Sequence, residues 1–381
     1  MIKNYTNTPL FDPLTIRSLT LKNRIAIAPM QMYNVGNGIT NDWHLIHLGR
    51  FALGGAGLII MEATAVRSDG RSTLHDTGLW SDLQIENLQR ITNFIRSCGS
   101  ASAIQLQHAG RKSSGQAPWH GFGPLGPKDA AERGEHSWRA WAPDRHGWSE
   151  DHPECHAMTE KDMDALLADY RIATQRAVAC GFDAVEIHAA HGYLLHSFLS
   201  PLSNKRTDHY GGSLENRMRF PLAVVRAVRE AWPNDRPLLC RIASVDGNQV
   251  GWQLNDSITF AKRLKAEGVD VIHCSSGGMN LPSRDDLVTR YPGFQIPFAE
   301  KIRAAANIPA IGVGLITKPE QANEIIKNER ADIIALGREA LWNPNWPLHA
   351  AISLNGKKGF SEWPRQFGWW LSRRYAKHKL T

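Results

Sequence analysis

Residues 238–273, LLCRIASVDGNQVGWQLNDSITFAKRLKAEGVDVIH, contain one strand–helix–strand unit that indicates how the rest of the chain is built. The runs Leu238–Ile242 and Val269–His273 are short and mainly apolar, as is typical of parallel strands that are buried on both faces. Between them, Asn255–Glu267 has helical patterning and is followed by Gly268, a residue that favours a helix end. The stretch therefore predicts two parallel strands joined by a helix.

Six further runs of this kind occur, most of them separated by segments with helical patterning. They are Arg24–Ala28, Gly57–Met61, Ala101–Leu106, Ala184–His188, Ala310–Val313 and Asp332–Leu336. The helix candidates include Pro319–Asn328 and Glu160–Cys180. The second begins with a capping-box-like pair, Thr159 and Asp162, and is followed by Gly181, which favours a helix end. Eight such units predict a (β/α)8 TIM barrel, with an open doubly wound sheet as the alternative that the pattern leaves.

Two segments depart from this alternation within what we expect to be one domain over residues 1–381. Residues 1–23 include an alternating run, Leu14–Leu21, which predicts an N-terminal hairpin at the bottom of the barrel. Residues 110–158 are rich in Gly, Pro, His and Trp, and they hold four of the thirteen tryptophans (119, 138, 141 and 148). Because this insertion follows the third strand, we expect a lid over the catalytic mouth; a surface linker is the alternative.

Composition excludes several classes of function. Lys and Arg total 44 against 37 acidic residues, and the basic residues do not cluster, which favours an anionic ligand over nucleic acid. No apolar stretch approaches the length of a membrane span, and the first residues lack the apolar core of a secretory signal. The five scattered cysteines form no Cys-x-x-Cys pair, so that we expect a cytoplasmic protein without disulfides or structural zinc.

Candidate catalytic residues follow the fourth strand, in the sequence Glu186-Ile187-His188-Ala189-Ala190-His191-Gly192-Tyr193. Imidazoles can donate hydrogen bonds to a ligand oxygen, and a phenol can deliver a proton. Structural histidines are one alternative. A metal site is another, but a His-x-x-His pair supplies only two ligands and no acidic partner follows at motif spacing.

Polar residues also occupy other strand ends. Gln105 and Gln107 would point the same way at the end of the third strand, so one amide can face a ligand. Arg241 lies inside the apolar fifth run, where it needs either an anionic ligand or an ion pair, for example with Glu186.

The last two strand runs end in Gly312-Val313-Gly314 and Gly337-Arg338. Loops at this place in barrels commonly bind phosphate, since glycine lets the backbone approach it and arginine can bind it bidentately. The residues by themselves thus predict a barrel with a phosphorylated ligand, but they give no indication of redox chemistry.

Several ordered motifs together resemble the old yellow enzyme family of FMN-dependent ene-reductases (NADH:flavin oxidoreductases), in its bacterial branch typified by xenobiotic reductases. The resemblance extends from Leu10 to about Trp346. It is carried by Asn41-Asp42-Trp43-His44, Glu62-Ala63-Thr64-Ala65-Val66, Gln107-His108-Ala109-Gly110-Arg111-Lys112, His188–Leu194, Ser203-Asn204-Lys205-Arg206-Thr207-Asp208 and Tyr210-Gly211-Gly212-Ser213.

The resemblance implies that FMN lies across the barrel mouth and that NADPH or NADH reduces it. The implied cofactor-binding residues are Ala28, Pro29, Met30, Gln31, Ala63, Gln105, Arg241, Gly314, Gly337 and Arg338. Of these, Arg241 would lie near flavin N1 and O2, and the last three would hold the phosphate.

The resemblance also implies a substrate site for a small molecule with a carbonyl-conjugated C=C bond. His188 and His191 would bind the carbonyl oxygen, Tyr33 would line the pocket, and Tyr193 would protonate the α-carbon as hydride passes from flavin N5 to the β-carbon. In this branch the C-terminal tail, here residues 361–381, can reach a neighbouring subunit, so that Trp370 is a further substrate-binding candidate in a homodimer or higher homo-oligomer. A cap on the chain's own barrel is the alternative for the tail.

One position departs from the branch, since Gln31 stands where a cysteine that contacts the flavin is usual. An amide can still hydrogen-bond flavin O4, and we expect an altered reduction potential. Other functions stay open at this point: reduction of acyl-CoA or aromatic thioesters or of nitro compounds on the same scaffold, a flavin-binding protein without turnover, and a non-redox phosphate-binding barrel.

Overall fold

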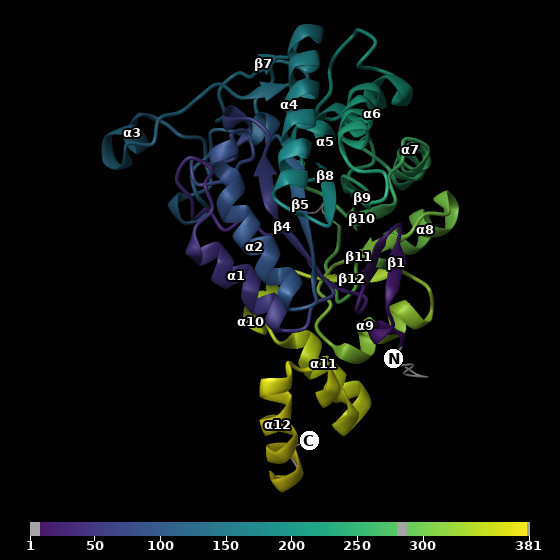
Figure 1. The fold of residues 1–381 in the computed structure, drawn as a ribbon. Coiled ribbons are helices and arrows are strands. Elements are labelled where there is room, and N and C mark those ends of the chain that lie inside the picture. The colour runs from purple at the N-terminus through teal and green to yellow at the C-terminus, as the bar shows by residue number, and fades with distance from the viewer. Residues whose placement is uncertain (1–7, 280–287, 379–381) are drawn as a thin grey trace.

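The computed structural model describes residues 8–279 and 288–378 and places eight parallel strands in one closed barrel (Figure 1). Around the barrel the strands follow the order β10-β11-β12-β3-β4-β5-β8-β9, and β9 pairs with β10 to close it. Their bounds are β3 Ile25–Ile27, β4 Leu58–Ala65, β5 Ala101–Gln107, β8 Ala184–Ala189, β9 Leu238–Ala243, β10 Val271–Ser275, β11 Ala310–Gly312 and β12 Ile333–Leu336. Every predicted strand overlaps one of these, and closure excludes the doubly wound sheet.

Helices cover the outside of the barrel, and apolar side chains fill the layer between helices and strands (Figure 1). The longer helices are α1 Asp42–Leu53, α2 Ile85–Ser97, α4 Glu160–Ala179, α6 Leu214–Ala231, α7 Leu254–Ala266, α8 Ile296–Ala306, α9 Pro319–Lys327 and α11 Trp346–Asn355. The predicted capping box is present at α4, where Thr159 Oγ1 accepts from the Asp162 backbone and the Asp162 carboxylate accepts from the Thr159 backbone. Gly181 has the positive φ of 78° that ends such a helix. Shorter pieces are α5 Leu194–Leu199, α10 Arg338–Trp342, η1 Pro9–Phe11, η2 Ser68–Gly70 and η3 Asp82–Gln84.

The barrel interior changes from apolar to polar along the strands. Its lower part is filled by small and aliphatic side chains, among them Ala26, Ala103 and Ile333. Because side chains on a strand alternate between two faces, residues two or four positions further along point into the same interior. This parity directs Gln105, Glu186, Arg241 and His273 inward, above the apolar part and toward the carboxyl ends of the strands.

The predicted N-terminal hairpin closes the opposite end. β1 Leu14–Ile16 and β2 Leu19–Leu21 pair antiparallel, and their leucine side chains pack against the apolar interior. Arg17 Nε donates to Asp270 Oδ1 at 2.6 Å, and the Ser18 backbone N–H donates to the Asp235 carbonyl at 3.0 Å. Both partners precede barrel strands, so the carboxyl ends of the strands form the open mouth.

The insertion after β5 contains several short regular elements. It contains η4 Gly110–Lys112, η5 Pro118–His120, α3 Pro127–Arg133, β6 Trp141–Ala142 and β7 His156–Ala157. Two of its tryptophans fix it to the loop after β4, since the indole N–H groups of Trp138 and Trp141 donate to the backbone carbonyl and the carboxylate of Asp69, each at 2.9 Å.

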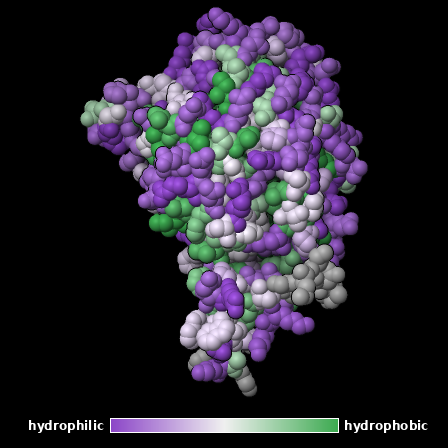
Figure 2. Space-filling model, in the orientation of Figure 1, coloured by the Kyte–Doolittle hydropathy of each residue, from purple (hydrophilic) through white to green (hydrophobic). Residues whose placement is uncertain are grey.

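The C-terminal segment continues as η7 Gly356–Glu362 and α12 Arg365–His378. α12 packs on η7, with Phe360 against Tyr375, and stands away from the barrel (Figure 1). It forms the narrow lower end of the mainly hydrophilic face in Figure 2. Among the helices of the described part of the chain, none is both long and apolar enough to span a bilayer.

Candidate active site

A cavity of about 760 Å³ lies at the mouth of the barrel. Strand ends and the loops after them line it, which is where barrel enzymes place their chemistry. Seven of the ten residues predicted to bind a cofactor line this cavity, together with His191: they are Ala28, Pro29, Met30, Arg241, Gly314, Gly337 and Arg338. Residues far apart in the sequence thus meet as the strand-end argument predicted.

Arg241 presents a buried cation to this cavity. Its side chain is 9% exposed, and its Nε has no hydrogen-bond partner among the described residues. The predicted alternative, an ion pair with Glu186, does not form, because Glu186 instead accepts from Gln105 Nε2 at 2.7 Å and pairs with His273 Nδ1 at 2.8 Å. Burial lowers the pKa of Arg241, while the Glu186 charge acts in the opposite direction. An anionic group in the cavity would supply the missing partner.

The other end of the cavity fits a phosphate. Gly314 has a φ of +126°, and a Cβ there would come within 3.1 Å of the Gln295 amide and the Phe294 ring. The position therefore requires glycine both for its backbone and for its space. Arg290 and Arg338 both line the cavity and bring two cations to it.

Three predicted cofactor residues lie beside the cavity lining rather than in it. Ala63 and Gln105 are register partners on β4 and β5 and are both almost fully buried. Gln105 uses its amide nitrogen on Glu186, as described above. Gln31 is engaged with protein groups at both ends of its amide.

His188, His191 and Tyr193 come together on one side of the mouth. The ring of His188 lies edge-on to both others, with centroids 5.1 Å from His191 and 4.8 Å from Tyr193. His191 has a positive φ of 59°, followed by Gly192 at 76°, and this turn brings the second imidazole and the phenol back over the strand end.

Hydrogen bonds define the tautomers of the two imidazoles. His188 Nδ1 accepts from the Ala190 backbone N–H at 3.2 Å, so its ring proton lies on Nε2, 3.3 Å from His191 Nδ1. His191 Nε2 lies 2.6 Å from Ser275 Oγ, which donates in turn to Gln295 Oε1 at 3.3 Å. Burial lowers the pKa of both imidazoles well below the usual value, and the Arg241 cation lowers it further. Both rings are therefore neutral near pH 7.

Tyr193 donates its hydroxyl proton to Gln31 Oε1 at 2.9 Å. Burial, with a smaller contribution from the Asp76 carboxylate, raises the pKa of Tyr193 to about 12. The phenol is therefore protonated throughout the physiological range.

The insertion contacts this side of the mouth at two points. Lys112 Nζ donates to the carbonyl oxygens of His191 at 2.6 Å and Gly278 at 2.9 Å, and it lies 3.8 Å from the ring centroid of Trp148. Trp119 lies edge-on to Tyr33 with ring centroids 5.8 Å apart. Trp370, in contrast, is 69% exposed on α12 and lies outside the cavity of its own chain.

Sequence reasoning missed several cavity residues: Ser275, Ser276, Arg290, Phe294 and Gln295. The two serines follow the sixth strand run directly, so the strand-end argument applied there would have found them. The other three carry no comparable signal, because they lie just before α8 and far from the strand run in sequence.

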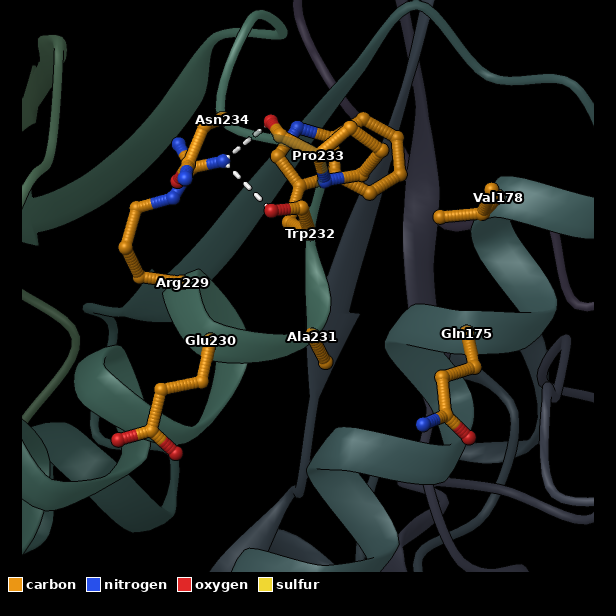
Figure 3. Close-up of a pocket in the computed structure, with 8 residues that line it drawn as sticks. All are labelled: Gln175, Val178, Arg229, Glu230, Ala231, Trp232, Pro233 and Asn234. Carbon is orange, nitrogen blue, oxygen red and sulfur yellow. Dashed lines mark hydrogen bonds between the residues drawn. The ribbon is translucent and has the colours of Figure 1, made fainter.

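A second cavity, of about 660 Å³, lies outside the barrel between α4 and the end of α6 (Figure 3). The Arg229 guanidinium within it donates to the carbonyl oxygens of Trp232 and Pro233, as Figure 3 shows, and so holds the turn after α6. Nothing in this groove resembles the convergent polar groups of the mouth. The described residues also contain no group of three side chains suited to bind a metal.

Comparisons with known sequences point to one family. The sequence model of the NADH:flavin oxidoreductase / NADH oxidase family matches residues 9–356. An NADPH dehydrogenase of Geobacillus thermodenitrificans is 45% identical over 353 residues, which cover 92% of this chain and 96% of the relative.

Two solved structures share the fold over most of their length. Morphinone reductase superposes with a TM-score of 0.75 at 27% identity, covering 92% of this chain and 91% of the other. An old yellow enzyme homologue from Zymomonas mobilis gives a TM-score of 0.70 at 26% identity, covering 89% and 91%.

Proposed function

Because the chain belongs to the NADH:flavin oxidoreductase / NADH oxidase family, we propose that this FMN-dependent NAD(P)H oxidoreductase reduces a C=C bond that is conjugated to a carbonyl group. When bound, FMN accepts two electrons from NADPH or NADH and passes them to the second substrate. The observation that carries the proposal is the convergence of two neutral imidazoles and one protonated phenol at the rim of the cofactor cavity.

The cavity residues fit FMN. Arg241 would lie near N1 and O2 of the flavin, where a fixed cation would stabilise the negative charge that develops on reduction. Gly314, Gly337 and Arg338 would hold the phosphate, with Arg290 as an additional cation. Ala28, Pro29 and Met30 supply an apolar surface at the end of β3, against which a flat ring can pack.

His188 and His191 would bind the carbonyl oxygen of the substrate. His188 Nε2 already carries a proton and points toward His191, so a substrate oxygen can take the place of His191 Nδ1 as its acceptor. His191 can donate from Nδ1 as well if Ser275 Oγ donates to its Nε2, since a neutral imidazole holds its proton on either nitrogen. The two N–H groups would stabilise the enolate oxygen that forms as the double bond is reduced.

Tyr193 would supply the proton that completes the reduction at the α-carbon. Its raised pKa keeps the phenol protonated, and its contact with the His188 ring supports a place beside the proposed oxygen site. Tyr33 and the insertion residue Trp119 would border the same pocket. The non-redox barrel considered from sequence is set aside by the flavin family of the chain.

An anaerobic product assay tests the proposal directly. With NADPH as reductant and 2-cyclohexen-1-one as a simple conjugated probe, the purified enzyme should form cyclohexanone, one molecule for each NADPH consumed. Cyclohexene, which lacks the carbonyl, should give no product because nothing would engage the histidine pair. The proposal would be contradicted if NADPH were oxidised only after oxygen was admitted and the enone stayed unchanged.

A further inference from the structure

The Gln31 amide joins two buried groups that lie far apart in sequence. Its Oε1 accepts the Tyr193 hydroxyl proton at 2.9 Å, and its Nε2 donates to Asp76 Oδ2 at 2.8 Å. The same nitrogen lies 3.4 Å from Ser72 Oγ, so both of its N–H groups have acceptors within the protein. Gln31 therefore has little freedom to donate to flavin O4, a contact that an amide at this position could otherwise make.

Asp76 is fully buried and is held in place by its own hydrogen bonds. It accepts from the Ser72 backbone N–H at 2.6 Å and from Thr73 Oγ1 at 2.7 Å. No salt bridge reaches this carboxylate from any residue that the structure describes. The carboxylate accepts in addition from the Thr73 backbone N–H and from the Gln31 amide.

The direction of the chain Asp76–Gln31–Tyr193 follows from the chemistry of its members. An ionised carboxylate can only accept hydrogen bonds, so it requires the NH₂ side of the amide. The carbonyl side of Gln31 must then face Tyr193, and it can only accept. The phenol is thereby obliged to donate its proton toward Gln31.

We propose that Asp76 is a positioning residue for Tyr193, acting through the Gln31 amide to hold the phenol protonated, with its O–H bond directed at Gln31, until a substrate is bound. The inference rests on the proposed function, in which Tyr193 donates the proton. In that step the Tyr193 O–H bond breaks as a C–H bond forms at the α-carbon of the enone, and solvent then reprotonates the phenolate. A phenolate would face the Gln31 carbonyl oxygen and lie near the Asp76 charge, so this arrangement disfavours loss of the proton until substrate accepts it.

Other charged groups act on the same chain. Burial, with a smaller contribution from the Glu62 charge, raises the pKa of Asp76 to about 6. Lys112 Nζ lies 5.5 Å from the Tyr193 ring centroid. A hydrogen bond with the Ser72 side chain and, less strongly, the Arg241 cation lower the pKa of Tyr193 against the larger effects of burial and Asp76. Tyr33 faces both Tyr193 and Asp76, and Arg71 faces Asp76. Above the pKa of Asp76 its carboxylate fixes the Gln31 amide; below it, a protonated Asp76 can donate and the amide can turn.

Replacement of Asp76 by Asn tests this role without a large change in shape. The charge disappears, and Gln31 becomes free to offer its NH₂ group to a phenolate, so Tyr193 should ionise at lower pH than in the unaltered enzyme. The measurement is an NMR titration of the FMN-loaded enzyme labelled with ¹³C at tyrosine Cζ, in which the Tyr193 resonance is assigned by its loss in Tyr193→Phe. The alkaline limb of enone reduction should move to lower pH in parallel, while flavin reduction by NADPH keeps its rate.

Asp129 provides a matched control. It is also buried, and it accepts from the Gly126 backbone and the Gln116 amide at 2.8 Å each, but it lies in α3 away from Tyr193. Asp129→Asn should leave the pH at which Tyr193 ionises unchanged. Asp76→Ser removes the same charge and serves where Asp76→Asn does not fold; the expected direction is the same.

A double variant separates action through Gln31 from a direct electrostatic effect. In a Gln31→Met background, the shift caused by Asp76→Asn should be smaller than in the unaltered background. An equal shift in both backgrounds, or no shift in either, would overturn the proposal. Because the titration does not depend on turnover, it stays informative even if Tyr193→Phe leaves enone reduction unchanged, a result that would overturn the proposed function instead.

Discussion

At the scale of single residues, the hydrogen-bond state of His188 decides what the site can bind. Its Nδ1 is occupied by a backbone N–H, and its Nε2–H is directed at the neighbouring imidazole. Burial and the Arg241 cation keep the ring neutral, so it can donate to an oxyanion without first losing or gaining a proton. The proposed substrate-oxygen site therefore needs no change of charge between pH 6.5 and pH 8.

His188→Ala should weaken the binding of phenols, which mimic an enolate oxygen, by about tenfold or more, because a hydrogen bond to a charged oxygen is lost. The measurement is a titration of the long-wavelength charge-transfer band that a phenolate gives over bound flavin. His209→Ala is the matched control, since His209 lies more than half exposed beside Glu160 on the surface. Equal phenol affinity in all three proteins would argue against the oxyanion site.

Position 31 shows how a single substitution connects to the rest of the site. The glutamine lies where the resembled branch usually has cysteine, and in this chain its amide joins Tyr193 to Asp76. The expected change in flavin potential stays a prediction. Because both polar ends of Gln31 bind protein groups, we expect a substitution at this position to change the pKa of Tyr193.

At the scale of elements, the tryptophans of the insertion have separate tasks. Trp138 and Trp141 are anchored by hydrogen bonds to Asp69, while Trp148 packs on Lys112. Trp119 is 63% exposed and touches Tyr33 by its edge. We propose that the two anchored tryptophans stabilise the insertion and that Trp119 contacts the substrate.

Trp119→Ala should raise KM for aromatic enones several-fold with little effect on Tm, because its ring is exposed and borders the pocket. Trp138→Phe should lower Tm instead, through loss of its bond to Asp69. Steady-state kinetics and thermal unfolding of both variants make the comparison, with Trp342→Ala, on an 86% exposed side chain of α10, as the surface control. A Trp119 variant with unchanged KM for large and small enones would remove Trp119 from the pocket.

The C-terminal helix α12 does not place the predicted residue Trp370 at the site of its own chain. α12 packs on η7 and exposes Trp369 and Trp370, so neither ring reaches the cavity of its own chain. The role of Trp370 in a neighbouring subunit's substrate site stays a prediction that a single chain does not test. α12 stands away from the barrel and so does not form a cap over it (Figure 1).

At the scale of the whole molecule, buried neutral histidines link stability to pH. The pKa of His47, His188 and His191 is lowered by burial in the folded chain and returns to its ordinary value on unfolding. Below about pH 6.5 the unfolded chain binds more protons than the folded one, so the free energy of unfolding falls by up to about 1.4 kcal/mol per pH unit for each such group. Urea unfolding of the flavin-loaded enzyme at pH 7.5 and pH 5.5 should show this loss.

His47→Gln should make the pH dependence shallower, since one group no longer takes up a proton on unfolding. His209→Gln, at the exposed site, should leave the slope unchanged. A slope that is equal in His47→Gln and in the unaltered enzyme would mean that the pKa of His47 is not lowered in the folded chain.

The barrel could be predicted from sequence because parallel strands buried on both faces carry a strong local signal, and Leu238–Ala243 or Ala184–Ala189 are clear examples. The cavity followed from the same signal, since the carboxyl ends of all strands meet at one mouth. The contact of Asp76 with Gln31 could not be predicted, because the partners are 45 residues apart and their loops carry no periodic pattern. The sequence also left open whether Arg241 pairs with Glu186. The structure shows that Glu186 instead binds Gln105 and His273.

The most direct test of C=C reduction is to measure the two half-reactions of Tyr193→Phe separately by anaerobic stopped-flow absorbance. Loss of the proton donor should slow reoxidation of the reduced enzyme by 2-cyclohexen-1-one by about 10²- to 10⁴-fold, the range for general acid catalysis. Reduction of the flavin by NADPH should keep nearly its original rate, because that step needs no proton from the phenol. Equal rates for enone reoxidation in the variant and the unaltered enzyme would contradict the account.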